Sequence, residues 1–202
     1  MRRMLWAVSA LAVVAFGCPS SKPSATGLEP GASAASVTPQ APASSSSSPP
    51  SSEQRYAGTY AFAGSDAERK GVEKAVDGAT EGMVGMNIAR TELMKRQEIR
   101  PTYTIRFDGK GNVAVETPGF PAEASPIDGT EVELKNKYGD VLENRQRFVD
   151  GALLQESRTH DGGGSTQFML QPDGNTLLVT RVSKSPKLPR TVQYTLTYHR
   201  QR

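Results

Sequence analysis

Histidine and cysteine, the side chains that most often carry catalysis, are scarce in this chain of 202 residues. The only candidates are His160, His199 and a single cysteine, Cys18. His160 lies in a glycine-rich turn and His199 lies near the end of the sequence, and no Gly-x-Ser-x-Gly pattern occurs. Nucleophilic catalysis needs a nucleophile beside a base that a third group orients. The sequence therefore predicts no enzyme, no metal site and no cofactor, and one cysteine excludes a disulfide framework.

Two further patterns resemble chemical sites but have simpler explanations. Glu131 and Glu133 alternate with Val132 and Leu134, which predicts a strand whose glutamates face water and whose aliphatic residues face inward. The stretch 161–164 is rich in glycine, but a phosphate-binding loop would continue with Lys and Ser or Thr and would lead into a helix. A hairpin loop between two strands explains it better.

Residues on two predicted strands are the best candidates for ligand binding. Arg181 shares a strand face with Leu177 and Val179, so an inward-facing apolar surface would carry an arginine that needs a carboxylate partner or an anionic ligand. Alternatively, Arg181 is solvated near the end of its strand. Tyr194 and Tyr198 lie on one face of the last predicted strand and combine an apolar body with a hydrogen-bonding hydroxyl. That composition suits an amphipathic ligand and also suits a plain hydrophobic core.

The first eighteen residues have the pattern of an export signal. Arg2 and Arg3 precede the apolar stretch 5–16, which is shorter than the roughly 20 residues that a membrane-spanning helix needs. The following Ala-Phe-Gly-Cys sequence, ending at Cys18, resembles the lipobox of bacterial lipoproteins. This resemblance implies cleavage after residue 17 and acylation of Cys18, which anchors the chain to a membrane of the cell envelope. Pro19 replaces the aspartate associated with inner-membrane retention, which favours the outer membrane. An ordinary signal peptide is the alternative.

A compositional change after Cys18 predicts a tether. Residues 19–54 contain twelve Ser, seven Pro and six Ala, with Leu28 and Val37 as the only larger aliphatic residues. Such a segment cannot bury enough apolar surface to fold. We therefore expect a signal peptide at 1–17, a lipidated and disordered tether at 18–54, and one folded domain at 55–202.

The start of the expected domain combines a strand with a helical region. Residues 56–62 are rich in aromatic residues and predict a strand, and a capping-box pattern follows at 65–68. Apolar residues then recur at helical spacing as far as Leu93, although three glycines favour two short helices or one kinked helix. We expect Met83, Met86 and Met94 to pack this region against a sheet; the alternative is that they line a ligand portal.

Beyond Pro101 the pattern alternates with a period of two, which predicts strands joined by tight turns. The stretch 117–129 is rich in Pro and Gly and predicts a loop. The expected strands are 102–107, 112–117, 130–136, 143–149, 152–159, 166–171, 177–183 and 190–199. The fold class is therefore mainly β (α+β): an antiparallel meander β-barrel, or a strongly curved sheet, of about eight or nine strands.

This order of elements resembles the calycin superfamily, and within it the fatty-acid-binding-protein branch. In that branch a glycine near an aromatic residue in the first strand precedes a helical lid, as Gly58 and Tyr60 do here. The later turns at Asp150-Gly151, Asp161-Gly162 and Asp173-Gly174 follow a similar hairpin rhythm. The family's last strand often carries Arg-x-Tyr, which holds a fatty-acid carboxylate; Tyr198 matches, but Leu196 replaces the arginine. Envelope lipoproteins with barrel domains and no assigned activity are also similar.

Together these patterns predict a membrane-anchored envelope lipoprotein that binds a hydrophobic or amphipathic, lipid-like small molecule without catalysis. The alternative is a structural or protein-interaction module of the envelope with a packed, ligand-free barrel. Lys and Arg number 24 against 21 Asp and Glu, and no basic block occurs, which argues against nucleic acid as a partner. The expected partners are the membrane, through Cys18, and a lipid-like ligand or an envelope protein.

Overall fold

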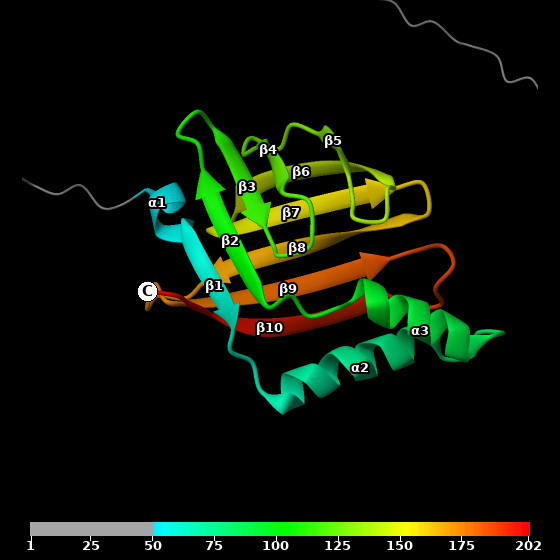
Figure 1. The fold of residues 1–202 in the computed structure, drawn as a ribbon. Coiled ribbons are helices and arrows are strands. Elements are labelled where there is room, and N and C mark those ends of the chain that lie inside the picture. The colour runs from blue at the N-terminus through cyan, green and yellow to red at the C-terminus, as the bar shows by residue number, and fades with distance from the viewer. Residues whose placement is uncertain (1–50) are drawn as a thin grey trace, which may run out of the picture. The chain divides into compact units, whose positions relative to one another are not determined.

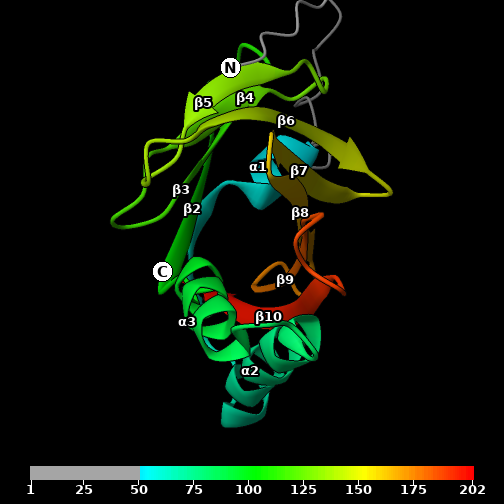
Figure 2. The ribbon, with the colours of Figure 1, turned by 90° about the vertical axis from the view of Figure 1, so that its right-hand side faces the viewer.

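The computed structural model describes residues 51–202, and this part of the chain forms a nearly closed antiparallel β-barrel with three helices (Figures 1 and 2). The signal peptide, Cys18 and residues 19–50 of the expected tether lie outside the described residues. A short helix, α1 (Ser52–Tyr56), begins inside the range assigned to the tether. Its capping residue, Ser51, exchanges hydrogen bonds with Gln54, so the expected domain boundary at residue 55 falls within this helix.

Ten strands form a single sheet, close to the eight or nine expected. They are β1 (Gly58–Phe62), β2 (Thr102–Phe107), β3 (Asn112–Glu116), β4 (Glu123–Pro126), β5 (Val132–Lys135), β6 (Val141–Val149), β7 (Ala152–Thr159), β8 (Gly162–Leu170), β9 (Thr176–Lys184) and β10 (Val192–Arg200). The strand order is β4-β3-β2-β1-β10-β9-β8-β7-β6-β5, so the first and last strands pair and turn the meander into a ring. The predicted mainly β, antiparallel architecture with helices after the first strand is confirmed.

The ring closes through β4 and β6 rather than through a continuous ladder between β4 and β5. An isolated bridge pairs Asp128 with Arg147, and the Gly129 amide donates to the Gln146 carbonyl at 3.0 Å. The Gln146 side chain also donates from Nε2 to the backbone carbonyl of Glu123 at 2.8 Å. An isolated backbone bridge and one side-chain hydrogen bond thus close the seam that lacks a continuous ladder.

Two helices, α2 (Asp66–Thr80) and α3 (Met86–Arg96), connect β1 to β2, so of the two expected alternatives the structure has two helices and not one kinked helix. Ser65 caps α2, and the helix packs Val72 and Val76 against the sheet. The Glu68 carboxylate accepts a 2.7 Å hydrogen bond from the Thr197 hydroxyl. This bond fixes α2 to β10, and the two elements lie next to each other in the ribbon (Figure 2). Among residues 51–202, no helix is both long enough and apolar enough to cross a membrane.

The expected apolar stripe is interrupted at the start of α3, although Leu93 at its end packs against the core. Gly85 adopts a left-handed conformation with φ of 74° at the start of this helix, which turns α3 away from the direction of α2. Met86, which the stripe included, is 43% exposed, and Ile88 in the same turn of α3 is 75% exposed. Met94 packs against the core, and Met83 lies at the cavity described below.

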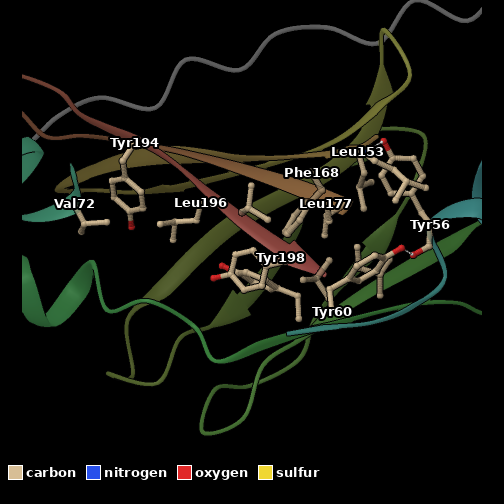
Figure 3. Packing of buried hydrophobic residues seen from close by; sticks show 14 of the residues in the cluster. Tyr56, Tyr60, Val72, Leu153, Phe168, Leu177, Tyr194, Leu196 and Tyr198 are labelled. Atoms are coloured by element: carbon tan, nitrogen blue, oxygen red, sulfur yellow. Dashed lines mark hydrogen bonds between the residues drawn. The ribbon is translucent and has the colours of Figure 1, made fainter. Parts of the chain in front are cut away.

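Large side chains fill the end of the barrel that α1 covers. Tyr60, Leu153, Phe168, Leu177 and Tyr198 are fully buried there (Figure 3). Edge-to-face aromatic contacts join Tyr103 to Phe168 and Tyr198, with ring centroids 5.2 and 5.1 Å apart. At the other end of the barrel the inward positions carry polar and charged residues instead.

Two segments that were predicted to be loops form β-strands in the structure. Residues 117–129 include β4, whose inward residues Glu123 and Ser125 are polar and therefore lack the apolar alternation that marks a strand. The glycine-rich stretch 162–164 belongs to β8 rather than to a hairpin loop, so the turn is confined to His160 and Asp161. A Cβ atom on any of these glycines would collide with a backbone oxygen of β7 or β9, and the glycines permit this close approach.

Candidate functional site

A cavity of about 560 Å³ opens at the end of the barrel opposite α1. It lies between α3, the β3–β4 segment, the β5–β6 hairpin and the adjoining ends of β8 and β9. Apolar lining comes from Met83, Leu93, Phe120, Leu134, Leu142 and Leu188. Three charged residues that face the barrel interior, Arg100, Glu123 and Arg181, line the same space.

Arg181 occupies an inward position on β9. Leu177 and Val179 precede it on the same face and are fully buried, and its register partner on β10 is the buried Tyr194. The structure therefore places Arg181 at the cavity and not on the outer, solvated face. Within residues 51–202, the Arg181 guanidinium makes no hydrogen bond and has no carboxylate within 4 Å. Arginine keeps its charge at any physiological pH. Burial opposes this charge, but the nearby Tyr194, Tyr103 and Glu123 favour it and raise the pKa of Arg181.

Arg100 is a second interior cation, which sequence reasoning did not identify. Its side chain is 13% exposed, and the guanidinium carbon lies 3.2 Å from the centre of the Phe120 ring. The Nη1 atom is 3.7 Å from Glu98 but has no hydrogen-bond partner in the described part of the chain. Burial, and then the charge of Arg181, lower the pKa of Arg100. Arg100 directly precedes Pro101 and has no place in any periodic pattern, so no local signal marks it.

Glu123 supplies the negative charge at this cavity. It points inward from β4, and its Oε2 atom accepts a hydrogen bond from the Gln155 side chain. Burial raises the pKa of the Glu123 carboxyl, although Arg181 and Arg100 act in the opposite direction. Because residues 117–129 were expected to form a loop, no sequence pattern indicated that this carboxylate lies inside the barrel.

Buried amides form a polar layer next to Glu123. Asn144 and Gln146 on β6 are fully buried, and Gln155 on β7 is 4% exposed. Gln155 donates to both Glu123 and Asn144, whereas Asn144 Nδ2 and Gln146 Oε1 find no partner among residues 51–202. Buried polar atoms are usually paired, so this part of the barrel is built around polar groups and not as an apolar core.

The two candidate tyrosines lie behind the cavity lining. The Tyr194 hydroxyl donates to Gln97 Oε1 at 3.1 Å, and Gln97 donates in turn to the Ser183 hydroxyl at 3.1 Å. The Tyr198 hydroxyl donates to the backbone carbonyl of Arg100 at 2.9 Å. Burial raises the pKa of Tyr198, which keeps this phenol protonated. Both tyrosines thus hold residues that line the cavity, while Arg181 lines it directly.

Aromatic rings and cations frame the mouth of the cavity. The Lys137 ammonium lies 3.9 Å from the centre of the Phe120 ring and 5.2 Å from that of Tyr138. Lys137 also pairs with Glu98 at 3.2 Å, and Arg96 of α3 lies 5.2 Å from the Tyr138 ring centre. These contacts join the β3–β4 segment and the β5–β6 hairpin across the open side of the barrel. The cationic side chains of Arg96 and Lys137 give the mouth a positive charge.

The remaining sequence candidates lie on the outer surface. The His160 side chain is 90% exposed, and His199 is also exposed. Glu131 and Glu133 are exposed as expected. No group of three or more His, Cys, Asp or Glu side chains within 51–202 is arranged to hold a metal ion.

No protein-family model and no curated protein matches this sequence. Among solved structures, the chain is similar to fatty acid binding protein of Schistosoma mansoni in complex with arachidonic acid, with 13% identity, a TM-score of 0.49, and coverage of 75% of this chain and 100% of that one. It is also similar to lipid binding protein 8 of Caenorhabditis elegans, with 14% identity, a TM-score of 0.49, and coverage of 73% and 96%. Fatty-acid-binding protein 1 of Echinococcus granulosus gives 14% identity, a TM-score of 0.46, and coverage of 73% and 98%. These values do not identify a ligand for this chain.

Proposed function

We propose that this protein binds an amphipathic small molecule with an acidic group inside its barrel, without catalysis. The observation that carries the proposal is the pair of interior cations, Arg100 and Arg181, at one cavity. Neither guanidinium has a hydrogen-bonded carboxylate among residues 51–202. Removing these charges from bulk water is costly, and an acidic ligand group placed between the two cations would offset that cost through charge-assisted hydrogen bonds.

The rest of the cavity suits the apolar part of such a molecule. Leucine, methionine and phenylalanine side chains line it together with the charged groups. Its volume of about 560 Å³ lies within the range of roughly 300–1,000 Å³ that is typical of small-molecule sites. The cavity also favours ligand binding over the alternative of a fully packed interaction module, because a packed barrel would fill this space with side chains.

We further propose that Cys18 is acylated and anchors the chain to a membrane of the cell envelope, with the outer membrane favoured. The support is the export-signal pattern of residues 1–17 and the lipobox-like sequence that ends at Cys18. The Ser-, Pro- and Ala-rich stretch 19–50 would then hold the barrel away from the membrane surface.

Matched twelve-carbon probes test the binding proposal. The full chain carrying Cys18→Ser, which removes the acylation site, is titrated with dodecanoate and with its uncharged methyl ester. We expect dodecanoate to bind with one-to-one stoichiometry in native mass spectrometry and at least about tenfold more tightly than the ester. Arg181→Gln should remove this difference, whereas Arg158→Gln, which changes an exposed arginine of β7, should preserve it. Binding of neither probe, or equal binding of both, contradicts the proposal.

A further inference from the structure

Three charged side chains share the cavity but do not pair with one another. Arg100 comes from the segment before β2, Glu123 from β4 and Arg181 from β9. Opposite charges in a poorly solvated space attract strongly. Among residues 51–202, however, the Glu123 carboxylate forms no ion pair within 4 Å of either guanidinium. The Phe120 ring holds Arg100, and the Gln155 amide holds Glu123. The cations and the carboxylate therefore influence one another electrostatically without forming a direct ion pair.

The Glu123 carboxylate retains free capacity to accept hydrogen bonds. Its Oε2 atom accepts from Gln155, and no donor reaches Oε1 from any residue in the range 51–202. An ionised carboxylate has about four acceptor positions on its two oxygens. The cavity thus presents two cations with free N–H donors and, separately, one acceptor that is only partly used.

A ligand with an acid as its only polar group would match the arginines but not Glu123. Its carboxylate would enter a cavity that already holds a carboxylate, and like charges at low dielectric constant disfavour one another. A hydrogen-bond donor next to the acid would turn that unfavourable contact into a favourable one. Hydrogen bonds to charged groups are stronger than those between neutral groups, so this donor would weigh heavily in ligand choice.

We propose that the ligand is an amphipathic acid that carries a hydroxyl, ammonium or amide N–H donor beside its acidic group. The acid binds Arg100 and Arg181, and the donor binds the free oxygen of Glu123. This assignment rests on the proposed function, because it concerns the ligand of the same cavity. Glu123, Arg100 and Arg181 all line this cavity, so one ligand head can reach the three charges together.

The test compares dodecanoate with 2-hydroxydodecanoate, which differ by one donor. Both are titrated against the full chain carrying Cys18→Ser at neutral pH by isothermal calorimetry. We expect the 2-hydroxy acid to bind at least about tenfold more tightly, the ratio that one hydrogen bond to a charged group provides. Dodecan-1,2-diol, which has donors but no acid, should bind more weakly than either acid.

Substitution of Glu123 assigns the preference to its carboxylate. Glu123→Gln keeps the size of the side chain and can still accept from Gln155, but it removes the negative charge. This variant should bind both acids within about threefold of each other and should bind dodecanoate at least as tightly as the unsubstituted protein does. Glu133→Gln, on the exposed face of β5, is the matched control and should keep the preference.

The outcomes separate this inference from the function on which it rests. Equal binding of the two acids to the unsubstituted protein overturns the inference while leaving the acid-binding function intact. Binding of neither acid overturns both. If Glu123→Gln does not fold, the comparison of the two acids on the protein with Glu123 present still decides the question. A preference that persists in folded Glu123→Gln also overturns the inference.

Discussion

The Tyr198 hydroxyl donates a 2.9 Å hydrogen bond to the backbone carbonyl of Arg100. This contact links the aromatic core to the cavity, because the Tyr198 ring packs against Tyr103 while the Arg100 side chain lies over Phe120. The last strand of the barrel thereby fixes the segment from which one of the two interior cations projects. Tyr198 is a positioning residue for Arg100.

Replacing Tyr198 with phenylalanine should affect both stability and binding. Tyr198→Phe keeps the ring but removes the donor to the Arg100 carbonyl, so the free energy of unfolding should fall by about 1 kcal/mol. Affinity for dodecanoate should fall several-fold, because Arg100 loses part of its support. Urea denaturation and calorimetric titration measure the two effects. Tyr138→Phe, at a half-exposed tyrosine near the mouth, should change stability by less than about 0.5 kcal/mol.

Removing an interior cation should stabilise the protein in the absence of ligand. Arg181→Met keeps a long, flexible side chain but removes a charge that has no direct partner among residues 51–202. We expect the free energy of unfolding to rise by about 1 kcal/mol, measured by urea denaturation, while affinity for dodecanoate falls at least tenfold. A loss of stability together with unchanged affinity would show that Arg181 is already compensated within the fold.

The Glu123 carboxyl should make a distinctive contribution to the pH dependence of stability. Burial raises its pKa above the ordinary value of 4.5, so the folded protein binds this proton more tightly than the unfolded chain does. The contribution of Glu123 is therefore most favourable below pH 4.5, and it is lost as the pH rises through the folded-state pKa.

Glu123→Gln isolates this contribution. The variant should be more stable than the unsubstituted protein at pH 7, and the difference should shrink as the pH falls towards 4.5. Thermal unfolding at a series of pH values measures it, with Glu133→Gln as an exposed control. A difference that grows on acidification would mean that Arg100 and Arg181 outweigh burial and lower the pKa of Glu123.

The glycines at the start of β8 should be intolerant of a side chain. Gly164→Ala places a Cβ atom against the carbonyl oxygen of Val182 on β9, and we expect a loss of about 1–3 kcal/mol in the free energy of unfolding. Gly71→Ala in α2 is the matched control, because no atom lies within 4 Å of the added Cβ. That variant should gain about 0.5–1 kcal/mol from helix propensity. Chemical denaturation of both variants provides the comparison, and equal effects would refute the close approach of β8 to β9.

The lipid anchor can be tested in cells. Cys18→Ser removes the proposed acylation site, so the protein should move from the membrane fraction to the soluble fraction or accumulate as an unprocessed precursor. Fractionation and immunoblotting measure this change, and Thr26→Ser within the proposed tether serves as a control. A Cys18→Ser variant that fractionates and migrates like the unsubstituted protein would exclude the anchor.

Much of the barrel could be predicted from local patterns. Val192, Tyr194, Leu196 and Tyr198 alternate with polar residues, and all four are buried in the structure as a period of two requires. The same logic located β2 and β7 and the start of α2 at its capping residue Ser65. These features depend on neighbouring residues along the chain, which is the information that a sequence pattern contains.

The chemistry of the cavity depended on contacts between distant segments. The sequence by itself determined the strand meander, the faces of most strands and the two possible environments of Arg181. Only the tertiary structure decided that Arg181 faces inward and that Arg100 and Glu123 join it. Closure of the barrel through polar contacts between β4 and β6 brings Glu123 to the interior, and a polar inward face on β4 produces no apolar alternation. A strand such as β4, whose inward side chains are polar or charged, therefore cannot be told from a loop by its sequence pattern alone.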